Sequence, residues 1–168
     1  MMTGEEIQTY LTLLGEEMEH NNIKGEICLY GGAVMCLVYQ ARPSTKDIDA
    51  VFQPAHQMRD AARRIASRFD LSEDWLNDGV KDFLVQHPQR VYLNLPALKV
   101  YVPEPDYLLA MKTLAARVDA TDREDVSILL RHLRITKPEE VFSILEKYYP
   151  NGQIRAATRF FVEELLQQ

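Results

Sequence analysis

The apolar residues near the start of the chain recur at the spacing of one helix face. They are Ile7, Leu11, Leu14 and Met18. Before them, Thr3 and Glu6 have the spacing of a capping box, in which each side chain satisfies a free backbone amide of the other residue. The pattern predicts a helix from about Thr3 to His20.

Further along, short apolar segments alternate with amphipathic ones. The segments typical of strands are 26–30, 46–52, 90–95 and 98–102. The segments typical of helices are 33–40, 56–69, 107–117, 121–133, 136–149 and a last one that carries Phe161 and Leu165. Segment 71–86 is expected to hold one or two short helices. This order predicts an α+β fold, with a small mixed sheet, helices packed on it and a helical C-terminal half.

Length and composition limit the organisation of the chain. Its 168 residues suffice for one domain with a hydrophobic core and are few for two. We expect a single domain over 1–168, with a sheet-containing core to about 105 and a helical part from about 106. Hydrophobic residues make up 46% and charged residues 26%, as is typical of soluble globular domains.

Charge and targeting signals narrow the setting. The net charge of −6 opposes tight binding to a nucleic-acid backbone over the whole surface, although a local basic patch remains compatible with it. No apolar run approaches the roughly 20 residues that span a bilayer, and the acidic N-terminus does not resemble a secretory signal. Cys28 and Cys36 fit neither a zinc site nor a disulfide framework, so we expect both to be reduced and buried. These features predict a cytoplasmic protein without a membrane partner.

Gly31 and Gly32 stand between a predicted strand and a predicted helix. Glycines at this point let a ligand approach the backbone, and the free amides of a helix N-terminus suit a phosphate. The alternative is a tight turn from strand to helix, which glycine also favours. The pair by itself does not decide between these interpretations.

Asp47 and Asp49 lie two residues apart in the predicted strand 46–52. The period of two places both carboxylates on one face, with Ile48 and Ala50 on the other. Two adjacent carboxylates repel each other unless a cation lies between them, and a hard divalent ion such as Mg²⁺ prefers oxygen ligands. The alternative is a pair of solvated aspartates on an exposed face.

Together, the glycines and aspartates form a metal-plus-triphosphate pattern: Gly31 and Gly32 for phosphate, Asp47 and Asp49 for the ion that bridges to it. With the intervening R-P-S-T-K-D-I-D, the stretch 29–52 resembles the nucleotidyltransferase superfamily, and within it most of all the AbiEii-type bacterial toxin–antitoxin proteins. The resemblance implies that Arg42 and Thr45 support the site, whereas the alternative for both residues is ordinary turn chemistry.

A second stretch, 106–130, resembles the later motifs of the same superfamily at Lys112, Arg117, Asp122 and Asp125. Lys112 falls on an apolar helix face, where a lysine either extends to solvent or meets an anion, here the β and γ phosphates of a nucleotide. Asp122 is explained as an acidic residue in a first helical turn. Asp125 would accept from Lys112 or Arg117, either as a catalytic base or as a structural partner.

One departure from the superfamily affects the function. Many nucleotidyltransferases add a third carboxylate from a later strand, but 90–95 and 98–102 contain no acid, and Asp106 is expected to cap the helix that follows. The four histidines are scattered, which gives no case for a hydrolase triad.

Three interpretations therefore remain. The first is an Mg²⁺-dependent enzyme that transfers a nucleoside monophosphate from an NTP to a hydroxyl on a protein, an RNA end or a small molecule. Its catalytic residues would be Asp47, Asp49, Lys112 and Asp125. The second is a catalytically inactive nucleotidyltransferase-fold binding protein, such as a toxin–antitoxin partner. The third is an interaction module in which both motifs are coincidental.

Overall fold

The computed structural model describes residues 1–168 except 117–119, 151 and 168. The chain forms two compact units, one made of Met1–Leu84 with Gln89–Pro103 and the other of Val85–Pro88 with Glu104–Gln168. The first unit contains β1 (Met2–Thr3), α1 (Gly4–His20), β2 (Gly25–Tyr30), α2 (Gly31–Leu37), β3 (Ser44–Thr45), β4 (Ile48–Gln53), α3 (Ala55–Phe69), β5 (Leu76–Asn77), the 3₁₀ helix η1 (Gly79–Phe83), β6 (Gln89–Asn94) and β7 (Leu98–Pro103). The second contains α4 (Pro105–Ala115), α5 (Ala120–His132), α6 (Pro138–Tyr148) and α7 (Ala156–Leu166).

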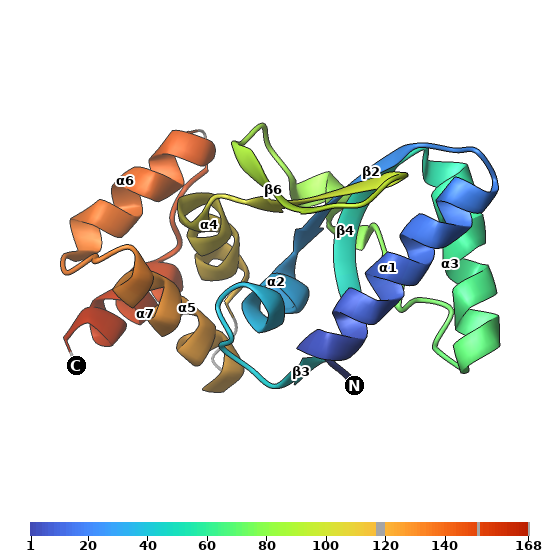
Figure 1. The fold of residues 1–168 in the computed structure, drawn as a ribbon. Helices are drawn as coiled ribbons and strands as arrows, with labels where there is room; N and C mark the ends of the chain where they lie inside the picture. Colours follow the sequence, from blue (N-terminus) through green and yellow to red (C-terminus); the bar gives the residue numbers. More distant parts are fainter. Residues whose placement is uncertain (117–119, 151, 168) are drawn as a thin grey trace. The chain divides into compact units, whose positions relative to one another are not determined.

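The first unit is built on a five-stranded mixed sheet in the order β5-β4-β2-β7-β6 (Figure 1). Strand β2 is central, antiparallel to β4 and parallel to β7, whereas β6 is antiparallel to β7 and β5 is parallel to β4. The predicted α+β fold with a mixed sheet is confirmed. The four strands expected from sequence all form, each with a boundary shifted by one to two residues.

Helices α1 and α3 pack against each other and against the sheet. The capping box of α1 forms as expected, with Thr3 Oγ1 accepting from the Glu6 amide at 3.2 Å and Glu6 Oε1 accepting from the Thr3 amide at 3.3 Å. Gly15 brings α1 close to the sheet, since a Cβ there would lie 3.5 Å from Leu98 Cβ. The helix face predicted from the hydrophobic spacing is fully buried.

Three features of the first unit differ from the sequence prediction. Helix α2 ends at Leu37 rather than near residue 40, and Gln40 adopts a left-handed conformation with φ +50°. Segment 71–86 contains a short strand, β5, as well as η1. Strands β1 and β3 were not predicted, because two-residue strands carry too little periodicity to be detected.

The second unit has Tyr107 at its centre. The Tyr107 hydroxyl accepts from the Val85 amide and lies 3.1 Å from the Tyr149 hydroxyl, and its ring stacks on His87 at a centroid distance of 4.0 Å. These contacts explain why Val85–Pro88 belongs to the helical unit although it precedes β6 in sequence. Within the described ranges, each helix is too short or too polar to cross a membrane.

The expectation that Asp106 caps α4 is wrong. Glu104 occupies the N-cap position and Pro105 follows it, so Asp106 lies inside the first turn. The carboxylate of Asp106 instead accepts from Tyr148 Oη at 2.9 Å and from Lys147 Nζ at 3.1 Å, which joins α4 to α6.

Trp75 offers a test of the packing in the first unit. Its indole is 1% exposed and donates through Nε1 to the Ala62 carbonyl of α3 at 2.9 Å. We expect Trp75→Phe to lower the free energy of unfolding by about 1–3 kcal/mol, because a buried hydrogen bond and part of the packing are lost. Urea denaturation measures the change. Phe83→Leu is the control: Phe83 is 72% exposed, so its replacement should change stability by less than about 0.5 kcal/mol.

Candidate functional site

The turn between β2 and α2 is shaped by an aspartate from the neighbouring strand. Gly31 follows Tyr30 with φ +59°, a conformation that side chains disfavour. The register of β2 with β4 pairs Tyr30 with Asp49, which places the Asp49 carboxylate beside the turn. A Cβ on Gly31 would lie 2.9 Å from Asp49 Oδ2. Glycine at this position therefore provides room for a carboxylate of the protein itself.

Gly32 makes a similar contact with the loop that precedes β4. A Cβ on Gly32 would collide with Thr45 Oγ1 and would lie 3.1 Å from Arg42 Nη1. Residues from both predicted motifs thus meet at one place: the two glycines, Arg42, Thr45 and Asp49. The expectation that these residues come together is borne out by the geometry, although the glycines are needed for close packing in the protein itself.

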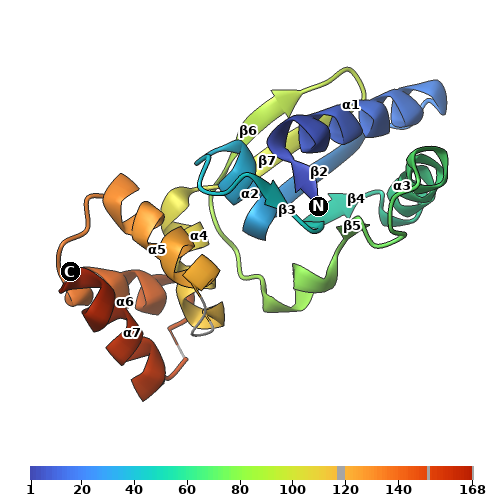
Figure 2. The ribbon, with the colours of Figure 1, turned by 90° about the horizontal axis from the view of Figure 1, so that it is seen from below.

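The N-terminal residues hold this loop in position. Met2 pairs with Thr45 and Thr3 pairs with Ser44 in the antiparallel β1–β3 ladder, which lies near α2 (Figure 2). Thr45 is 6% exposed, and its hydroxyl donates to the Asp47 carbonyl at 3.3 Å. The sequence gave no sign of the contribution of Met2 and Thr3 to the site, because pairing between residues so far apart leaves no local pattern.

Asp47 precedes β4 instead of lying within it, which corrects the predicted strand of 46–52. The expected alternation nevertheless holds. Ile48 and Ala50 are fully buried, whereas Asp47 and Asp49 are partly exposed. The two aspartates therefore alternate with the core residues as predicted, and solvent reaches both carboxyl-bearing residues.

The donor set at the turn suits a hard divalent cation. Asp47 and Asp49 supply carboxylate oxygens, the ligand type that Mg²⁺ prefers. In the described part of the chain, no group of three or more His, Cys, Asp or Glu residues is arranged to hold a metal ion. Mg²⁺ is commonly bound through one or two carboxylates, with phosphate oxygens and water as further ligands. The two aspartates fit that mode of binding and do not form an all-protein cage.

The two motif residues of the second unit pair with each other. Lys112 Nζ lies 2.7 Å from Asp125 Oδ2, and their side chains are 14% and 1% exposed. One of the partners expected for Asp125 is therefore confirmed. Asp122 lies in the first turn of α5, as its helix-dipole explanation requires. Arg117 falls outside the described residues.

Both cysteines are free and buried, as expected. Burial raises the pKa of the Cys28 thiol to about 11, so the group stays neutral at physiological pH. A neutral thiol is a poor nucleophile, which leaves Cys28 with a packing role.

The fold and the aspartate pair beside a Gly-Gly turn are those of a nucleotidyltransferase-like α+β protein. Residues 9–142 match the model of a family described as nucleotidyltransferase of unknown function (DUF6036). The match spans more than half of the chain, and the protein belongs to this family. The comparison with curated proteins gives no match.

One solved structure is similar in fold. It is the crystal structure of an antigenic nucleotidyltransferase-like protein from Paracoccidioides brasiliensis, with 16% sequence identity and a TM-score of 0.51. The alignment covers 99% of this chain and 94% of that one. At this identity the likeness supports the fold alone.

The close approach at Gly32 can be tested by a single methyl group. We expect Gly32→Ala to lower the free energy of unfolding by about 1–3 kcal/mol, because the new Cβ must displace Thr45. Adding Thr45→Ala to this variant should restore part of the loss. Gly4→Ala is the matched control, since its Cβ would meet its nearest atom, Cys36 O, at an ordinary 3.7 Å. Equal effects of Gly32→Ala and Gly4→Ala would contradict the packing described.

The Lys112–Asp125 pair has a test of its own. Lys112→Met should lower the free energy of unfolding by about 3–5 kcal/mol, because it leaves a buried carboxylate unpaired. The double variant Lys112→Met/Asp125→Leu should recover most of that loss. Lys147→Met, which breaks the more exposed pair with Asp106, should have little effect. A small loss for Lys112→Met would show that the pair is not structural.

Proposed function

We propose that the protein is an Mg²⁺-dependent nucleotidyltransferase that moves a nucleoside monophosphate from an NTP to a hydroxyl acceptor. The observation that carries the proposal is the meeting of Asp49 and Thr45 with the Gly31-Gly32 turn, with Asp47 two residues before Asp49 on the same side of the strand. Membership of the nucleotidyltransferase family supports the reaction class.

The proposal gives each residue a task. Asp47 and Asp49 would hold Mg²⁺, which when bound neutralises phosphate charge and orients the triphosphate. Arg42, whose guanidinium lies beside Gly32, would pair with a phosphate oxygen. Thr45 would act as a positioning residue, because its hydroxyl bonds to the backbone of Asp47.

In the reaction, the acceptor oxygen would form a bond to the α-phosphorus, and the bond from that phosphorus to the bridging α–β oxygen would break to release pyrophosphate. The acceptor would be a protein side chain, a small molecule or an RNA end. The net charge of −6 makes the first two the better candidates. A cytoplasmic location belongs to the same proposal and is supported by the two free cysteines.

The roles that the resemblance gives to Lys112 and Asp125 in phosphate binding and catalysis stay predictions. Their mutual ion pair in the second unit has a structural explanation, since it neutralises a carboxylate that is 1% exposed.

A second function is favoured by one specific observation. Strands β6 and β7 carry no acidic residue, and no three-carboxylate group occurs among the described residues. A nucleotide-binding protein without turnover, such as a toxin–antitoxin partner, would have this composition. It would bind NTP and Mg²⁺ but release no pyrophosphate with any acceptor.

The nucleotide site is tested by thermal shift. Each NTP is titrated with and without Mg²⁺ against the wild type and against Asp47→Asn/Asp49→Asn, with Asp70→Asn as the control. Asp70 is exposed and adopts φ +54°, a conformation that asparagine tolerates equally well. We expect one NTP to stabilise the wild type and the control by about 2.7 kcal/mol at a hundredfold excess over Kd, and the double variant by much less.

The outcomes separate the candidates. A Mg²⁺-dependent shift with pyrophosphate release supports the enzyme, and the same shift without release supports the binding protein. An equal shift in the double variant would reject Asp47 and Asp49 as the metal ligands, and no shift with any NTP would reject both functions.

A further inference from the structure

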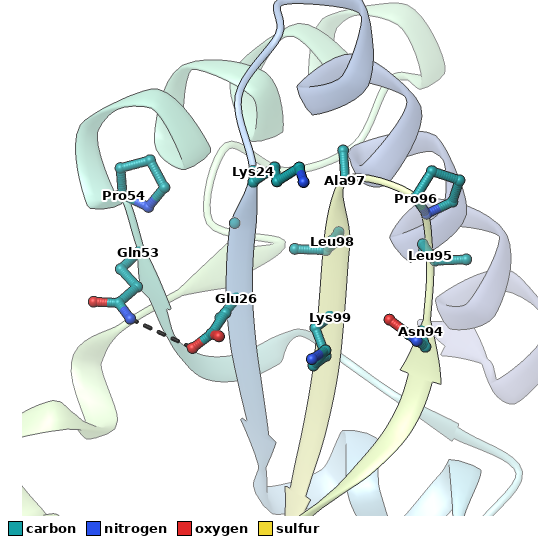
Figure 3. A pocket seen from close by; sticks show the side chains of 11 residues that line it. Lys24, Glu26, Gln53, Pro54, Asn94, Leu95, Pro96, Ala97, Leu98 and Lys99 are labelled. Carbon is teal, nitrogen blue, oxygen red and sulfur yellow. Dashed lines mark hydrogen bonds between the residues drawn. The ribbon is translucent and has the colours of Figure 1, made fainter.

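A row of polar side chains crosses one face of the sheet in the first unit. Strand register pairs Gln53 of β4 with Glu26 of β2, Glu26 with Lys99 of β7, and Lys99 with Asn94 of β6. Residues paired in this way point to the same face of a sheet. In Figure 3 the Lys99 side chain stands between those of Glu26 and Asn94.

This row borders a cavity of about 700 Å³. The β6–β7 turn and the start of β2 close its end, where Lys24 extends toward Ala97 (Figure 3). A smaller cavity of about 200 Å³ shares Glu26 and Gln53 with it and is lined by Cys28 and Tyr101. The face therefore offers a continuous hollow with polar residues at one end and less polar ones at the other.

The charges in the larger cavity are unbalanced. Lys24 and Lys99 both line it, and neither forms an ion pair with any residue that the structure describes. Glu26 is the acidic residue of the lining, and its Oε2 accepts from Gln53 Nε2 at 3.5 Å. On a chain of net charge −6, two lysines without acidic partners in one cavity favour an anion.

We propose that this cavity binds a small anion which also carries a hydrogen-bond donor. Lys24 and Lys99 would contact the anionic group, the side-chain amide of Asn94 would donate to it, and Glu26 would accept from the donor. The carboxylate of Glu26, in the middle of the row, would repel the closely spaced phosphates of a nucleic acid. The ligand is therefore a small molecule.

The cavity is separate from the proposed nucleotide site. It lies at Gly25, the first residue of β2, whereas the Gly31-Gly32 turn follows the last residue of that strand. Five residues of strand separate Gly25 from Tyr30, about 17 Å at the usual rise per residue. An anion held by Lys24 and Lys99 is thus distinct from the triphosphate at Asp47 and Asp49.

The proposal is tested by NMR titration of the full chain in Mg²⁺-free buffer containing EDTA. The first probe is inorganic phosphate, an anion that carries a hydroxyl donor at neutral pH, and the second is succinate, which has none. We expect saturable amide shifts with phosphate at residues lining the cavity, among them Gly25 and Lys99, and weaker binding of succinate. The apparent Kd should rise with ionic strength, because the contacts are charged.

Four variants give the signs of the effect. Lys24→Gln/Lys99→Gln should raise the phosphate Kd at least about tenfold, and Lys99→Arg should retain binding. Glu26→Gln should lower the Kd by removing a repulsive charge. Lys137→Gln removes an exposed lysine that does not line the cavity, and it should change nothing.

Shifts scattered over many surface lysines, or a Kd unchanged in the double lysine variant, would overturn the proposal, as would the absence of saturable shifts with both probes. Succinate binding as well as phosphate would retain the anion site and reject the need for a donor. None of these results depends on NTP binding, so the nucleotide site can fail while this site stands.

Discussion

The antiparallel register between β2 and β4 sets the position of every other residue at the proposed site. It pairs Tyr30 with Asp49, so the carboxylate of one strand meets the turn that ends the other. Only a residue without a Cβ leaves room there, since a side chain on Gly31 would need both a left-handed backbone and the space that Asp49 Oδ2 occupies. A one-residue slip would turn Asp49 into the core and Ile48 toward solvent, and the buried face of β4 prevents it.

A second constraint acts on the loop between α2 and β4. Arg42 and Thr45 lie in this loop, and the two-residue β1–β3 ladder ties it to the start of the chain. Thr3 both caps α1 and pairs with Ser44, so the helix that covers the sheet and the loop that meets Gly32 share one anchor. The geometry of the site therefore depends on backbone pairing between residues about forty positions apart, as well as on the motif residues themselves.

Much of the fold and part of the site were predictable from sequence. The α1 face, the four longer strands and the alternation around Asp49 follow from periodicity, which is strong where one face is buried. The β1–β3 ladder was not predictable, because it depends on a long-range pairing of four residues. Asp106 was misassigned as a cap because the adjacent Glu104 and Pro105 also suit a helix start, and its ties to Lys147 and Tyr148 come from α6. The sequence marked Gly31 and Gly32 as important, but it did not show that they make room for Asp49 and Thr45.

The central claim is that Asp47 and Asp49 hold a divalent cation beside the Gly31-Gly32 turn. The most direct test replaces Mg²⁺ with paramagnetic Mn²⁺, which also prefers oxygen ligands, and records the broadening of backbone amide signals as Mn²⁺–ATP is added. The account predicts that broadening begins at residues 30–32 and 45–49 and that Asp47→Asn/Asp49→Asn abolishes it there. Broadening that begins elsewhere, or that spreads evenly over the acidic surface in both proteins, would contradict it.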